Sequence, residues 1–203
     1  MTKILILKGG SYKSVGEMFA RHGYEVLYGH ENLSQVNVVV FTGGSDVSPY
    51  IYGEEPHGAR GCDPIRDELE KEIYNKAQDL GLTCIGICRG GQLLNVLNCG
   101  EMIQDLGKDS QSGVVPMFDA LSGEYVDVLV DHHQGILVNE GEGETYAWNE
   151  EADKFAENVS LWPDYLVIYP GTKSFCFQPH PEWGHKPTEE YFFDKLKVLG
   201  VLE

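Results

Sequence analysis

The chain has 203 residues, 42% of them hydrophobic, and a formal net charge of −17 at pH 7, which fits one globular domain over residues 1–203. The acidic balance excludes a nucleic-acid surface, since phosphate binding needs clustered lysine and arginine, and no apolar run reaches the ~20 residues of a membrane span. The five cysteines lack metal-ligand spacing, so we expect no metal and a reducing, cytoplasmic setting.

The first half of the sequence alternates strand-like and helix-like segments. Its strand candidates are almost continuously apolar, which is typical of a parallel sheet covered on both faces. They are residues 3–8, 24–28, 36–41 and 82–87. Helices are predicted for residues 14–23, 63–81 and 91–98.

Capping residues set the predicted ends of the first two helices. Ser14 with Glu17 forms a capping box, and Gly23 is a plausible stop. In the second helix Asp63 is the cap, Pro64 takes the first helical position, and Gly81 ends the helix.

The pattern changes after Gly100. Strand-like segments separated by turn-rich spacers follow, at residues 124–131, 144–148, 165–171 and 174–183, and a closing helix is predicted for 188–200. Residues 107–123 have few periodic apolar positions and are predicted to form a surface loop. The fold class is therefore α/β: a doubly wound, mostly parallel, flavodoxin-like sheet flanked by helices, with extra C-terminal strands.

The stretch Gly-Ile-Cys-Arg-Gly at residues 86–90 stands where a strand meets a helix. This pattern is typical of a nucleophile elbow, in which the sharp turn displays the central side chain. The helix N-terminus then favours the thiolate of Cys88, and the backbone N–H of Arg89 is placed to hold an oxyanion. A structural cysteine at a tight turn is the alternative.

A nucleophile needs a base and an orienting group, and the stretch Gln-Pro-His-Pro-Glu-Trp offers both. His180 and Glu182 stand two positions apart on a segment expected to be extended, so their side chains point to the same side. Gly43 and Gly44 follow the third strand, where their N–H groups can approach a ligand beside Cys88.

With these residues in place, the chain resembles the class I glutamine amidotransferase-like superfamily, and within it the γ-glutamyl-γ-aminobutyrate hydrolase (peptidase C26) group. The matching stretches run in family order from residue 42 to 183 and include TGGSDVSPYIYGE, DPIRDELE, GICRGGQLLNVLNCGEMIQDLG, DHHQGI and FQPHPEW. Two features depart from the family pattern: Val130 stands where a serine is frequent, and residues 107–123 lack a usual histidine-containing strand.

The resemblance implies a role for each matching residue. Cys88 would be the nucleophile, His180 the base and Glu182 its partner, with oxyanion N–H groups from Gly44 and Arg89. Gln92 would line the glutamyl pocket, and the segment around His132, His133 and Gln134 would form the rim of that pocket.

We therefore expect a cysteine hydrolase that cleaves a small γ-glutamyl amide through a thioester, with no cofactor. The alternative is a glutaminase subunit that passes ammonia to a separate synthetase; a non-catalytic binding module is a third reading. The sequence favours no nucleic-acid or membrane partner and leaves a homodimer open.

Overall fold

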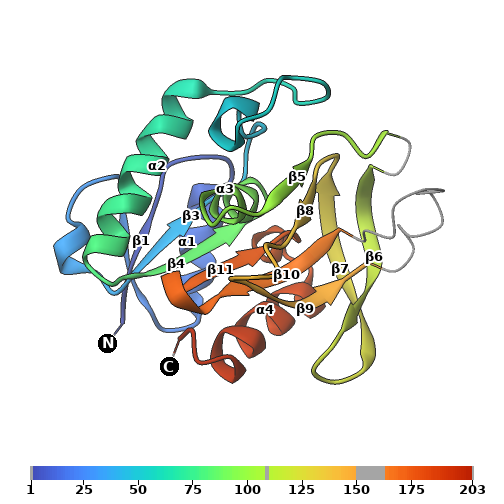
Figure 1. Ribbon diagram of the computed structural model, residues 1–203. Helices are drawn as coiled ribbons and strands as arrows, with labels where there is room; N and C mark the ends of the chain where they lie inside the picture. Colours follow the sequence, from blue (N-terminus) through green and yellow to red (C-terminus); the bar gives the residue numbers. More distant parts are fainter. Residues whose placement is uncertain (1, 108–109, 150–162, 203) are drawn as a thin grey trace.

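The computed structural model describes residues 2–107, 110–149 and 163–202, and in these residues one mixed sheet organises the fold (Figure 1). Its path runs β2-β1-β3-β4-β11-β10-β9-β6-β7, and each pairing from β2 to β11 is parallel. These five strands are β1 (Lys3–Ile6), β2 (Glu25–Tyr28), β3 (Val38–Phe41), β4 (Thr83–Ile87) and β11 (Ser174–Phe177).

The remaining strands extend this parallel core in antiparallel fashion. They are β10 (Asp164–Tyr169), β9 (Glu144–Trp148), β6 (Gln111–Asp119) and β7 (Glu124–His132). Two short strands lie off the main path, where β5 (Glu101–Ile103) pairs with β8 (Gly135–Leu137) and β8 with β10. The expected parallel core with added strands is confirmed.

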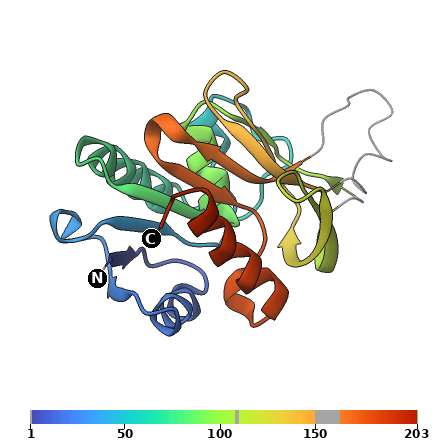
Figure 2. The same ribbon diagram turned by 90° about the horizontal axis from the view of Figure 1, so that it is seen from below.

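Helices cover both faces of the sheet, as the two ribbon views show (Figures 1 and 2). In β1, Ile4 and Ile6 pack in one buried cluster with α1 (Tyr12–Arg21) and α4 (Lys186–Val198). Leu5, and Leu7 just beyond the strand, pack in the other, with α2 (Pro64–Asp79) and α3 (Arg89–Leu97). Burial on both faces explains why β1, β3 and β4 are almost continuously apolar, whereas β2, at the edge of the sheet, is only partly buried. Short 3₁₀ helices are η1 (Leu33–Gln35), η2 (Pro49–Tyr52), η5 (Pro170–Thr172) and η6 (Pro181–Trp183).

Of the four capping positions predicted from the sequence, three are confirmed. The Asp63 carboxylate accepts a hydrogen bond from the Arg66 N–H at 3.1 Å, and Gly81 and Gly23 follow their helices with φ of 64° and 89°. The predicted capping box at Ser14 is wrong. Helix α1 starts earlier, after Ser11, because the chain already turns at Gly10, whose N–H donates to the Gly43 carbonyl.

The loop predicted for residues 107–123 is also wrong over most of its length, because Gln111–Asp119 forms β6. All nine of its residues are in register with β7, yet only Met117 and Asp119 are buried. Backbone pairing at the outer part of the sheet thus creates a strand that apolar periodicity could not indicate. The strand predicted for residues 174–183 ends at Phe177, and a 3₁₀ turn follows.

Candidate active site

Cys88 lies between the end of β4 and the first turn of α3, with φ 51° and ψ −115°. Two glycines allow this sharp turn. A Cβ on Gly86 would lie 2.4 Å from the Gly90 carbonyl oxygen, and one on Gly90 would lie 2.0 Å from that of Phe41. Only glycine fits at either position, so the glycine pattern in the sequence corresponds to a real elbow.

A hydrogen bond to β11 fixes the backbone at Cys88, and the loop after β3 lies beside it. The Cys88 N–H donates to the Phe177 carbonyl of β11 at 2.7 Å, and the residue as a whole is 7% exposed. Arg89 is the first residue of α3, so its own N–H has no acceptor within the helix and is available to a ligand. A Cβ on Gly43 would lie 3.4 Å from the His180 ring and 3.8 Å from the Cys88 Cβ, so the loop after β3 borders both residues.

His180 is buried and held from two sides. Its Nδ1 lies 2.8 Å from the Glu182 carboxylate, and its ring stacks on Trp183 at 3.7 Å between centroids. The expected extended segment is wrong: Pro181–Trp183 is the 3₁₀ turn η6, and this turn carries the carboxylate and the indole back onto the imidazole. His180 and Glu182 are paired as expected, but the chain brings them together by a turn and not along an extended segment.

The charge of His180 depends on these neighbours. Burial alone lowers the pKa of the imidazole, but the Cys88 sulfur and the Glu182 carboxylate more than offset this, so the pKa is raised well above its ordinary value. An imidazole with a raised pKa keeps its proton at neutral pH and acts first as an acid.

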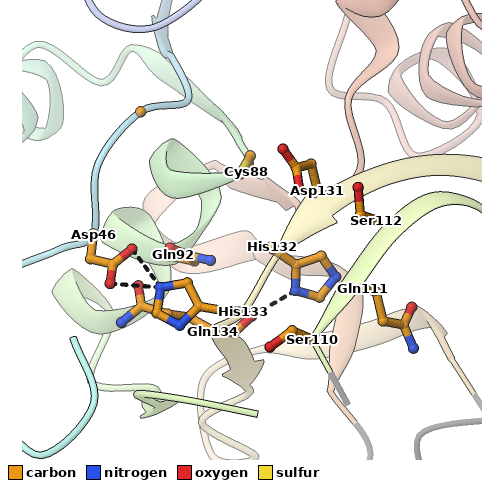
Figure 3. A pocket seen from close by; sticks show the side chains of 11 residues that line it. Asp46, Cys88, Gln92, Ser110, Gln111, Ser112, Asp131, His132, His133 and Gln134 are labelled. Carbon is orange, nitrogen blue, oxygen red and sulfur yellow. Dashed lines mark hydrogen bonds and ion pairs between the residues drawn. The ribbon is translucent and has the colours of Figure 1, made fainter. Parts of the chain in front are cut away.

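Two cavities meet at Cys88. The first has a volume of about 300 Å³, and Figure 3 shows the side chains that line it. The second, of about 200 Å³, is lined by Gly10, Ser11, Gly43, Gly44, Cys88, Asp131, His180 and Trp183. Gly44, Cys88 and Asp131 line both cavities, while His180 lines only the second.

Gln92 and His133, which the resemblance assigns to a glutamyl pocket and its rim, both line the first cavity. The Gln92 amide donates to Gln178 at 3.1 Å, and the His133 ring lies 2.8 Å from Asp46, the contact drawn in Figure 3. His132 lies along the cavity wall with its ring bonded to the Gln134 carbonyl and the Tyr165 hydroxyl. Burial lowers the pKa of His132 to about 4, so it is neutral.

The sequence reasoning missed a buried ionic network behind the elbow. The Arg89 guanidinium forms ion pairs with Asp67 and Glu70 of α2, so its side chain points away from the cavities and only its backbone faces them. Asp67 and Glu70 stand in heptad register with the buried Tyr74 and Ala77. That register is the sequence signal that could have revealed their burial.

Arg66 connects the same network to the loop after β3. Its guanidinium donates to the Thr42 carbonyl at 2.8 Å, to the Gly43 carbonyl at 3.0 Å and to Glu70 at 2.8 Å. Both backbone segments that border the sulfur are therefore tied to one pair of carboxylates on α2.

Within the part of the chain that the structure describes, no group of three or more His, Cys, Asp or Glu side chains is placed to hold a metal ion. None of the helices in those same residues is long and apolar enough to cross a membrane.

Comparison with known proteins gives a family match and several sequence relatives. The peptidase C26 family model matches residues 24–142. The glutamine amidotransferase-like protein YvdE of Lactococcus lactis is 48% identical over 79 residues, which are 38% of this chain and 34% of that protein. A protein of Mycobacterium tuberculosis named as a glutamine amidotransferase is 38% identical over 168 residues, which are 74% of this chain and 52% of that one. The chain thus spans about a third to a half of these relatives.

A solved structure shares the fold over nearly the whole chain. It is described as part of a GMP synthase from Thermoplasma acidophilum, with a TM-score of 0.71 and 14% identity, covering 98% of this chain and 94% of that one.

Proposed function

Since the chain belongs to the peptidase C26 family, within the class I glutamine amidotransferase-like superfamily, we propose that it hydrolyses γ-glutamyl amides through a glutamyl thioester on Cys88. One observation carries this proposal. The sulfur on the elbow borders a buried imidazole, and a carboxylate holds that imidazole. Nucleophilic catalysis needs this sequence of contacts, from nucleophile to base to orienting group.

In the first half-reaction the Cys88 thiolate would attack the γ-carbonyl carbon. The oxygen of the tetrahedral intermediate would be held by the N–H groups of Gly44 and Arg89. The C–N bond then breaks, and the departing nitrogen takes the proton that His180 carries at neutral pH. The products of this step are the free amine and a thioester.

In the second half-reaction a water molecule gives its proton to the now neutral His180 and adds to the thioester carbonyl. The C–S bond breaks, glutamate leaves, and the charged pair of sulfur and imidazole is restored. Glu182 would keep Nδ1 of the ring protonated throughout, so that Nε2 faces the reacting atoms.

A glutamine-shaped electrophile tests this proposal directly. A diazoketone analogue of glutamine should add once to the protein, and peptide mapping should place the adduct on Cys88, with protection by excess γ-glutamyl amine. Iodoacetamide serves as the control, because it needs a reactive thiol but no glutamyl recognition. A Cys88 that reacts with iodoacetamide and ignores the glutamine analogue would overturn the γ-glutamyl assignment.

A second candidate is a glutaminase subunit that delivers ammonia to a synthetase on another chain. The fold shared with the GMP synthase structure favours it. Turnover of the isolated protein separates the two functions: a γ-glutamyl amine hydrolase releases glutamate alone, whereas a dependent glutaminase is labelled by the glutamine analogue yet turns over only when its synthetase is added.

A further inference from the structure

The second cavity, together with the side chains at its mouth, carries an inference about the substrate that rests on the proposed function. In that function the proton on His180 must reach the departing nitrogen. Since His180 lines the second cavity and not the first, the departing amine lies in the second cavity. The glutamyl part then occupies the first, beside Gln92.

The lining of the second cavity is acidic. Asp131 contributes an exposed carboxylate, and among the described residues that line this cavity none is a lysine or an arginine. His180 is the remaining cation, but the Cys88 sulfur and Glu182 flank it and compensate its charge. The Arg66 guanidinium lies behind Gly43 but is paired with Glu70. Asp131 is therefore the carboxylate without a countercharge in the cavity lining.

The aromatic wall has the same preference. Trp183 is 42% exposed, and its ring nitrogen donates to the Ser11 hydroxyl at 3.1 Å, so the indole is fixed at the cavity wall. One face of the indole stacks on the His180 ring, so the opposite face is the one left to attract a cation, and a neighbouring carboxylate adds to that attraction.

We propose that the second cavity binds a leaving amine with a second positive charge, so the substrate class is the γ-glutamyl derivatives of diamines and longer polyamines. An amine ending in a carboxylate would meet Asp131 as a like charge, with no lysine or arginine among the described lining residues to pair with it. Asp131 and Trp183 are thus specificity residues for the leaving group.

Three γ-glutamyl amides of equal chain length test this, ending in an ammonium, a methyl or a carboxylate group. The wild-type protein should show the highest kcat/KM for the ammonium substrate and the lowest for the carboxylate. Asp131→Asn should lower kcat/KM for the ammonium substrate about threefold to fivefold, the upper end expected of one exposed ion pair, and leave the methyl substrate within about twofold. Added salt should shrink the preference.

Asp127→Asn is the matched control, because Asp127 is an exposed carboxylate on the same face of β7 that lines neither cavity. It removes the same charge and should leave all three rates unchanged. If Asp131→Asn lowers the three rates equally, Asp131 binds the glutamyl head and the inference fails. If the wild-type protein prefers the carboxylate substrate, the inference fails while the proposed function stands. If it cleaves none of the three, the proposed function fails instead.

Discussion

The replacement Arg66→Lys tests whether the hydrogen bonds of Arg66 fix the loop after β3 beside Cys88. The guanidinium bonds two carbonyls of the loop after β3 and Glu70 at the same time. A lysine ammonium keeps the positive charge beside Glu70 but lacks the planar fork, so it cannot reach both carbonyls as well. The loop that carries Gly44 would then lose its tie to α2.

The expected magnitude follows from the bonds that are lost. The Arg66 side chain is 13% exposed, so water can partly replace it, and the lower end of about 1.5 kcal/mol for each bond to a charged group applies. Two lost bonds give a decrease of about 3 kcal/mol in the free energy of unfolding. Complete removal of an oxyanion donor costs about 10²–10³ in kcat, and a displaced donor should cost about tenfold.

Three measurements separate the possible outcomes. Urea unfolding gives the stability, steady-state hydrolysis of a chromogenic γ-glutamyl amide gives kcat and KM, and iodoacetamide gives the alkylation rate of Cys88, a reaction without an oxyanion. We expect a lower stability and kcat, with alkylation unchanged. Arg21→Lys is the control, since Arg21 forms an exposed ion pair with Glu189 on α4, at the opposite face of the sheet. An unchanged kcat in a destabilised Arg66→Lys protein would refute the reasoning, and so would a parallel loss of alkylation.

Three further changes probe the elbow and its partners. Cys88→Ala should lower kcat about 10⁴–10⁶-fold and leave the urea midpoint nearly unchanged, because alanine keeps the Cβ and removes only one sulfur atom, which borders a cavity; a retained kcat would exclude Cys88 as the nucleophile. Glu182→Gln should lower kcat less than His180→Ala, because the carboxylate orients the ring without touching the substrate; equal losses would mean that the roles are assigned wrongly. Gly90→Ala should abolish folding or activity, since its Cβ would lie 2.0 Å from the Phe41 carbonyl, whereas Gly171→Ala, with open space around it, should alter neither the melting temperature nor kcat.

Local patterns with a steric or capping cause were predictable from the sequence. The apolar runs predicted the parallel strands, Asp63 and Gly81 predicted the ends of α2, and the glycines around Cys88 predicted the elbow. Each of these leaves a mark in the local pattern of residue types, even where the cause lies elsewhere: Gly90 is required because the Phe41 carbonyl of β3 leaves no room for a side chain.

Features that leave no mark in the local pattern of apolar and capping residues were not predictable in the same way. Strand β6 forms because β7 pairs with all nine of its residues, although its own side chains are mostly not buried. The Arg89 side chain finds its carboxylates on α2, about twenty residues earlier in the chain. Asp131 reaches the site through its register on β7, which brings it beside Trp183 from the far end of the chain.

The backbone of Cys88 has a consequence for the stability of the whole fold. A residue with a side chain at φ 51° and ψ −115° is strained, by about 1–3 kcal/mol, and the surrounding packing must supply that energy. Glycine would relieve the strain and remove the sulfur together. At this position glycine would give the more stable fold and cysteine gives the reactive thiol. Selection for stability alone would therefore favour glycine over the cysteine that is there.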